Sequence, residues 1–90
     1  MITIRNKDEM EKYYIEEVET VVFNDDVEFL CDINVKANIY AYNIKASNIN
    51  YYVICFSYNN IECNSIKGRY PNSKHLVLDG ELIIKGEENK

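Results

Sequence analysis

The 90-residue chain predicts a mainly β protein, a small β-solenoid (β-helix) built from short parallel strands. Three features lead to this prediction. Apolar residues come in pairs separated by one residue, the pairs recur every five to seven residues over most of the chain, and a short polar residue precedes most of them, as in NIYAYNIKASNINYY, residues 38–52. The spacing within a pair places both side chains on one face of a strand. A step of five residues falls about 140° out of register on an α-helix, which excludes a helical repeat.

The paired pattern extends on both sides of this segment. The pairs step by six residues from position 21 to position 39 and by five from position 39 to position 54. They are Val21-x-Phe23, Val27-x-Phe29, Ile33-x-Val35, Ile39-x-Ala41, Ile44-x-Ala46, Ile49-x-Tyr51, Ile54-x-Phe56, Ile61-x-Cys63, Ile66-x-Gly68, Leu76-x-Leu78 and Leu82-x-Ile84. A polar residue comes directly before seven of the pairs, and these residues are Asp26, Asp32, Asn38, Asn43, Asn48, Asn60 and Ser65. Such side chains bend the chain by bonding nearby backbone amides, so each predicts a corner.

The number of sides in each coil follows from how the pairs are grouped. Three sides give coils with pairs at positions 21/27/33, 39/44/49 and 54/61/66. Four sides of five residues would instead stack Ile39 above a residue near position 59. The six-residue steps favour three sides, and an irregular β-sandwich is the alternative fold. In a solenoid the stacked inward residues form the core, and neighbouring coils pair through parallel strands.

Both ends of the chain predict caps, within one domain spanning residues 1–90. Residues 1–19 form the N-terminal cap, with a short helix in residues 6–19 that Asn6 or Asp8 begins and that carries Met10, Tyr14 and Val18 on one face. Residues 20–69 contain the solenoid repeats. Residues 70–84 form a C-terminal cap in which HLVLDGELIIK is a hairpin around Asp79-Gly80, and residues 85–90 are a tail.

Charge is the most informative bulk property. The net charge is -5, but residues 1–32 carry -7 and residues 33–78 carry +4. No apolar run approaches the roughly 20 residues of a membrane span, and the first residues lack the apolar segment of a signal peptide. We therefore expect a cytoplasmic protein without membrane contact.

Enzymatic and metal chemistry find little support in the sequence. The chain has three cysteines, Cys31, Cys55 and Cys63, and none of them forms a C-x-x-C pair. Only one histidine, His75, could join them as a metal ligand, so neither a disulfide framework nor a zinc site is indicated. There is no Ser/His/Asp spacing and no phosphate-binding glycine loop. We expect no enzyme, no metal and no cofactor.

Outward tyrosines form a second candidate surface. Tyr40, Tyr42, Tyr52 and Tyr58 alternate with lysines along the repeats. Basic and aromatic residues in alternation can stack on single-stranded nucleic acid, whereas tyrosine is also a common strand residue. The acidity of the chain favours the second interpretation, so direct nucleic-acid binding is not expected.

The Asn-Ile-x-Ala phrase in residues 38–51 resembles the pentapeptide-repeat proteins, whose unit is A-[DN]-L-x-x. Alanine here precedes isoleucine by three positions instead of two, which departs from the four-sided coil of that family. The six-residue units at positions 21–41 are more similar to bactofilins, cytoskeletal solenoids that polymerise through their ends. Residues 20–84 as a whole resemble Asn-Ile-x-Ala repeat proteins of low-GC bacteria and their mobile elements, and SIKGRYPNSKHLVLDGEL is similar to the C-terminal end of that group.

These resemblances imply two kinds of function. Some pentapeptide-repeat proteins mimic DNA, and small acidic proteins of phages and mobile elements, including anti-CRISPR proteins, block nucleic-acid-binding grooves. The leading hypothesis is therefore a non-enzymatic inhibitor that binds a nucleic-acid-handling enzyme through an acidic surface. The alternative is a structural solenoid that assembles into a homodimer or filament, as bactofilins do. The candidate acidic surface comprises Asp8, Glu9, Glu11, Glu16, Glu17, Glu19, Asp25, Asp26 and Glu28.

Overall fold

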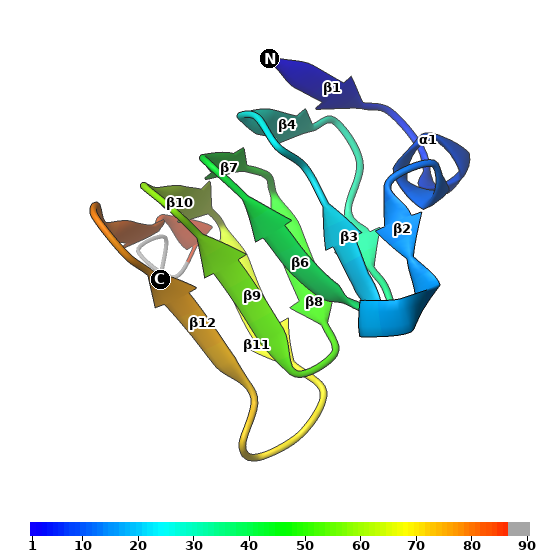
Figure 1. Cartoon of the computed structure of the whole chain (residues 1–90). Coiled ribbons are helices and arrows are strands. Elements are labelled where there is room, and N and C mark those ends of the chain that lie inside the picture. The colour runs from blue at the N-terminus through cyan, green and yellow to red at the C-terminus, as the bar shows by residue number, and fades with distance from the viewer. Residues whose placement is uncertain (87–90) are drawn as a thin grey trace.

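The computed structural model describes residues 1–86, which wind into a three-sided β-solenoid of about four coils (Figure 1). The first side contains β1 (Ile2–Ile4), β4 (Val27–Phe29), β7 (Ile44–Lys45), β10 (Ile61–Cys63) and β13 (Leu82–Ile84). The second side contains β5 (Ile33–Asn34), β8 (Asn48–Tyr51) and β11 (Ser65–Gly68). The third side contains β2 (Tyr14–Ile15), β3 (Thr20–Val22), β6 (Asn38–Ala41), β9 (Ile54–Ser57) and β12 (Lys74–Val77). Neighbouring strands are parallel except β2, which runs antiparallel to β3. The predicted solenoid of short parallel strands is confirmed.

The strand register establishes the three-sided coil. Val27, Ile44 and Ile61 lie in line on the first side, so a central coil takes 17 residues. Ile33 and Ile49 are aligned in the same way on the second side. This agrees with the grouping in threes and rules out a stack of four-sided, five-residue units. The longer last coil contains the predicted loop, which the chain forms between β11 and β12.

The predicted corners also bind one coil to the next. Before the first side, the Asn43 amide nitrogen donates to Asp26 Oδ1 at 2.9 Å. Asn43 Oδ1 accepts from the Asn60 backbone nitrogen at 3.0 Å, and Asn60 Oδ1 accepts from the Glu81 nitrogen at 2.8 Å. The polar residues that bend the chain therefore form a ladder of hydrogen bonds parallel to the coil axis.

The other two corners use the same device. Asn48 donates to Asp32 Oδ1 at 3.1 Å and accepts from the Ser65 hydroxyl at 2.7 Å, before the second side. Before the third side, Asn38 Oδ1 accepts from the backbone nitrogens of Val53 and Ile54 at 3.0 and 2.8 Å. These bonds occupy polar groups that the sharp corners would otherwise leave without a partner.

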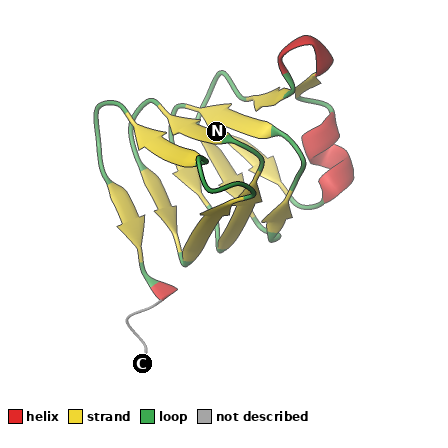
Figure 2. Cartoon of the chain, turned by 90° about the horizontal axis from the view of Figure 1, so that it is seen from below, coloured by secondary structure: helices red, strands yellow, loops and turns green. Residues whose placement is uncertain are grey.

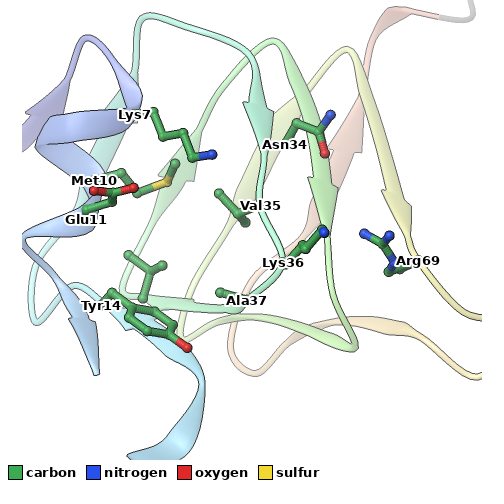
Figure 3. A pocket seen from close by; sticks show the side chains of 10 residues that line it. Lys7, Met10, Glu11, Tyr14, Asn34, Val35, Lys36, Ala37 and Arg69 are labelled. Atoms are coloured by element: carbon green, nitrogen blue, oxygen red, sulfur yellow. The ribbon is translucent and has the colours of Figure 1, made fainter. Parts of the chain in front are cut away.

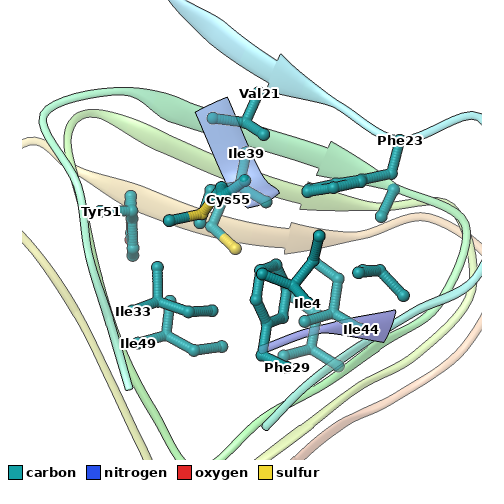
Figure 4. Close-up of a cluster of buried hydrophobic side chains, with 14 of the residues drawn as sticks. Ile4, Val21, Phe23, Phe29, Ile33, Ile39, Ile44, Ile49, Tyr51 and Cys55 are labelled. Atoms are coloured by element: carbon teal, nitrogen blue, oxygen red, sulfur yellow. The ribbon is translucent and has the colours of Figure 1, made fainter. Parts of the chain in front are cut away.

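The core lies inside the triangle formed by the three sides. Figure 4 shows side chains from all three sides meeting in its interior, among them Ile4, Ile33, Ile39, Ile44 and Ile49. Each of these isoleucines is at most 2% exposed. Full burial of one such side chain contributes about 1.5 to 3 kcal/mol, so the stacked isoleucines supply much of the stability.

The predicted inward pair of β9 is wrong by one residue. Cys55 aligns with Ile39 and Ser57 with Ala41, so Cys55 and Ser57 face the interior and both are fully buried. The Ser57 hydroxyl lies 2.8 Å from the carbonyl oxygens of Tyr42 and Asn60, which satisfies it there. Ile54 and Phe56, which we expected inside, therefore point outward.

The last strand of the third side is also reversed relative to the prediction. Leu76 and Leu78 are 42% and 62% exposed, whereas Val77 packs against the core. The cause is register, because Leu76 aligns with the outward Phe56 and Val77 with the inward Ser57.

The two ends differ from the predicted caps. The helix α1 (Lys7–Glu11) begins at Asn6, as predicted, but it ends before Tyr14, which lies in β2. Val18 belongs to a short 3-10 helix, η1 (Glu16–Val18), and is exposed instead of sharing a helix face with the buried Met10. Figure 2 shows α1 and η1 together at one end of the coil stack. Since β1 already pairs with β4, the solenoid begins before residue 20.

The predicted C-terminal hairpin is not formed. The strand β12 pairs with β9 on the third side and β13 pairs with β10 on the first, so the two strands continue the solenoid. Asp79 and Gly80 lie at the corner between them. A Cβ atom at Gly80 would lie 2.2 Å from Asn60 Oδ1, so glycine is needed for the close approach of the coil below. Of the predicted tail, residues 87–90 lie outside the described residues.

Candidate functional site

The structure gives His75 and the cysteines structural surroundings. His75 Nδ1 lies 3.0 Å from the Tyr51 hydroxyl. Cys55 and Cys63 are buried, and burial raises the pKa of the Cys55 thiol to about 12. Within residues 1–86, no three His, Cys, Asp or Glu side chains are placed to hold a metal ion.

Several of the nine acidic residues of the candidate surface have structural partners within the chain. Glu9 Oε1 accepts from the Arg5 backbone nitrogen at 2.7 Å, and the Glu9 nitrogen donates to Asn6 Oδ1 at 2.9 Å. Asp26 accepts from Asn43 in the corner ladder. These carboxylates fix the first helix and the first corner.

Asp25 also has partners within the chain, and Glu28 lies next to a lysine in the sheet register. Asp25 accepts from the Asp26 backbone nitrogen at 2.6 Å and pairs with the N-terminal amine at 3.3 Å. Both contacts hold the pKa of Asp25 below its ordinary value, the backbone hydrogen bond more strongly. Glu28 lies on the first side in register with Lys45.

The remaining five acidic residues are exposed at the N-terminal end. Asp8 and Glu11 lie on α1, and Glu16, Glu17 and Glu19 lie in and just after η1. We call these last three residues the acidic edge. The Glu19 carbonyl accepts from the Asn38 nitrogen at 2.9 Å, which attaches the acidic edge to the third side. Glu19 has a left-handed backbone with φ of 50°, so the turn into β3 is sharp.

An aromatic and aliphatic surface covers the outside of the third side. The outward residues Val22, Tyr40, Phe56 and Leu76 form one row across four strands. The rings of Tyr40 and Phe56 are stacked with centroids 5.3 Å apart. Tyr42 and Tyr58 follow the ends of their strands, 41% and 46% exposed, with ring centroids 6.1 Å apart. We call these six residues the aromatic face.

Charge is nearly absent from this surface. By register, the outward positions of β3, β6, β9 and β12 include one charged residue, Lys74. The outward positions of β4, β7 and β10 on the first side are Glu28, Lys45 and Glu62. The third side therefore differs from the central strands of the first side, whose outward residues are charged as in a typical solvated sheet.

Three of the four tyrosines of the second candidate surface lie together. Tyr40, Tyr42 and Tyr58 share the aromatic face, whereas Tyr52 follows the second side and packs on Tyr70 with ring centroids 5.4 Å apart. Phe56 and Leu76 were not predicted as surface residues because the apolar pairs place both in the core. One signal in the sequence was available. Ser57 lies beside a corner, where its hydroxyl can bond to backbone carbonyl oxygens, so Cys55 and Ser57 could have been considered as the inward pair of β9.

A groove of about 660 Å³ lies between α1 and the second side and was not predicted (Figure 3). Its floor includes the buried Met10, Val21 and Ala37, and three of its lining residues are basic, namely Lys7, Lys36 and Arg69. The groove is separate from the aromatic face, which lies outside the third side.

Comparisons with protein-family models, with curated proteins and with solved structures found no match. Within residues 1–86, the helices are too short and too polar to cross a membrane.

Proposed function

We propose that the protein is a non-enzymatic binding module that attaches to another protein through the outside of its third side. One observation carries the proposal: an almost uncharged aromatic face and an acidic edge lie on the same side of the solenoid. Protein interfaces combine a core rich in aromatic residues with a polar or charged rim, and tyrosine is among the residues that contribute most to binding.

The acidic edge indicates the kind of partner. Glu16 and Glu17 are exposed, and the Glu19 backbone carbonyl is bonded to the start of β6, so the acidic edge lies at the end of the third side where β3 and β6 begin. A partner of complementary chemistry has an apolar surface flanked by lysines and arginines. Enzymes that handle nucleic acids carry such basic surfaces to neutralise phosphates. We therefore infer an acidic inhibitor of a nucleic-acid-handling enzyme in the cytoplasm, of the DNA-mimic or anti-CRISPR-like kind that the resemblance to mobile-element repeat proteins implies.

The test compares two variants of equal charge change. Glu16→Lys/Glu17→Lys reverses the acidic edge, and Asp79→Lys/Glu81→Lys reverses two exposed carboxylates at the far end of the chain. Immobilised wild-type protein and both variants are exposed to lysate of the native host, and bound proteins are identified by mass spectrometry. We expect a nucleic-acid-handling enzyme to bind the wild type and the far-end variant, to be lost with the acidic-edge variant, and to be displaced by an oligonucleotide.

A second variant in the same capture experiment tests the aromatic face. Tyr42→Ala/Tyr58→Ala removes exposed rings and leaves the core intact, so the fold is retained and capture is lost. Capture of the same enzyme by the acidic-edge variant, or no displacement by the oligonucleotide, contradicts the proposal.

Self-assembly is the second candidate function, in the manner of bactofilins, and the open strand edges favour it. The strands β1 and β13 are the outermost strands of the first side, and such edges can pair with another chain. Light scattering over a range of concentrations separates the two functions. A particle whose mass rises with concentration and is insensitive to salt favours assembly, whereas a monomer favours the inhibitor.

A further inference from the structure

We propose that the groove beside α1 binds a small phosphorylated molecule of about the size of a mononucleotide. The groove exists because the first coil forms α1 where later coils place a strand of the second side, which leaves β5 as the outermost strand there. Its volume of about 660 Å³ lies within the range of small-molecule sites, roughly 300 to 1,000 Å³.

The charge of the groove indicates an anionic ligand. Lys7, Lys36 and Arg69 line it, with Glu11 as its one acidic residue. The two ion pairs formed within residues 1–86 involve the N-terminal amine and Lys85, so none of the three groove cations is neutralised by such a pair. The groove therefore has a local excess of positive charge in a chain of net charge -5. The three cations come from α1, from the segment after β5 and from the residue after β11.

The basic residues come from different coils and converge on the same groove. The Tyr52 nitrogen donates to the Ala37 carbonyl at 3.0 Å, and the Arg69 nitrogen donates to the Tyr52 carbonyl at 3.1 Å. Lys36 and Arg69 are therefore about two strand spacings apart, on the order of 10 Å between backbones. Figure 3 shows Lys7 extending from α1 on one wall, with Lys36 and Arg69 on the other. Three long cationic side chains can hold a phosphate group between them.

The rest of the groove is suited to an apolar or aromatic ring. Met10, Val21 and Ala37 are at most 4% exposed and form an apolar floor, and Tyr14 is 41% exposed at the rim. An exposed tyrosine ring can stack on a base. A phosphate beside a base is the chemistry of a nucleotide.

A free nucleotide suits this groove better than a nucleic-acid strand. Residues 1–32 carry -7, so a strand that continues beyond the groove would meet exposed carboxylates outside it, such as Glu16 and Glu17. Like charges repel over about 10 Å at moderate salt. A molecule that ends within the groove avoids this repulsion.

Calorimetric titration with ADP, adenosine and pyrophosphate tests the proposal. We expect ADP to bind the wild type, and adenosine and pyrophosphate to bind at least about tenfold more weakly, since each lacks one half of the recognised group. Lys36→Glu/Arg69→Glu should weaken ADP binding by at least about tenfold, the value of one lost charge-assisted hydrogen bond. The control Lys67→Glu/Lys74→Glu makes the same charge change at exposed positions outside the groove and should leave ADP binding unchanged.

Several outcomes overturn the proposal. In the first two, the folded wild type fails to bind ADP, or it binds adenosine as tightly as ADP. In the third, the control variant loses as much affinity for ADP as the groove variant. In the fourth, a 12-nucleotide oligonucleotide binds more tightly than ADP. If the double Glu variant does not fold, as judged by thermal melting, Lys36→Gln/Arg69→Gln replaces it and should weaken ADP binding in the same direction. The protein-capture experiment on the acidic edge is independent of these results.

Discussion

The ladder of corner side chains gives a direct test of how the coils are held together. Replacement of Asn43 by alanine removes two hydrogen bonds at once. The Asn43 side chain donates to Asp26 at 2.9 Å in a partly buried setting, and it accepts from the Asn60 backbone nitrogen at 3.0 Å in an exposed one. The variant therefore removes the side-chain bonds from the middle coil to both neighbours at this corner, and it leaves the core and the backbone bonds of Asn43 and Ile44 in place.

The expected loss follows from the surroundings of the two bonds. A net hydrogen bond contributes about 0.5 to 1.5 kcal/mol, and water partly replaces the exposed one. Asn43→Ala should lower the free energy of unfolding by about 1 to 2 kcal/mol. For a domain of this size that corresponds to a decrease of roughly 4 to 16 °C in Tm.

Urea unfolding followed by far-UV circular dichroism measures this loss against a matched control. Asn50 is an exposed asparagine of the same coil whose side chain makes no hydrogen bond within residues 1–86, so Asn50→Ala should change stability by less than about 0.5 kcal/mol. A double-mutant cycle with Asp26→Ala should show coupling to Asn43. Equal effects of Asn43→Ala and Asn50→Ala would refute the view that the ladder joins the coils.

Three further predictions concern the core, pH and the thiols. Ile44 is 2% exposed, so Ile44→Ala should cost about 2 to 5 kcal/mol in urea unfolding and Ile44→Asp should abolish the folded circular dichroism spectrum. The hydrogen bond and charge of Lys85 lower the pKa of Glu62, so this carboxylate stabilises the fold above its unfolded pKa and stops doing so as the pH falls through its folded pKa. Between about pH 5 and pH 3 the urea midpoint of the wild type should therefore fall more steeply than that of Glu62→Gln. A thiol reagent at pH 8 should modify the partly exposed Cys31 first and reach Cys55, whose pKa burial raises to about 12, only in urea.

The repeated part of the fold was predictable because two local signals agreed. Inward isoleucines such as Ile39 and Ile44, and polar corner residues such as Asn43, together define where each short strand begins. The structure confirms that these isoleucines are buried and that Asn43 lies at a corner. The six-residue steps between the first pairs favour three sides in each coil over four.

Register errors arose where both faces of a strand were apolar. In β9 the alternatives were Ile54 with Phe56 or Cys55 with Ser57, and hydrophobicity alone favours the first. The structure selects the second, because pairing with β6 aligns Cys55 with Ile39 and Ser57 with Ala41. Register depends on the neighbouring strand, which the local pattern does not contain.

The candidate surfaces were harder to predict for the same reason. The acidic residues lie close together in sequence, but the sequence does not show that Glu9, Asp25 and Asp26 bond to nearby backbone or to the next corner. The groove could not be anticipated, since Lys36 and Arg69 are brought together by the stacking of coils 33 positions apart in the chain.

The 17-residue coil makes the molecule adjustable in length. Removal of residues 44–60 would place Ile61 against Val27 and leave Asn43 before the strand, so the corner ladder and the triangular section would both be preserved. Stability in such stacks depends chiefly on nearest neighbours. Each inserted or deleted coil would change the length of the aromatic face by about 4.8 Å, the spacing between strands. The length of the solenoid can thus change by whole coils while its triangular cross-section stays constant.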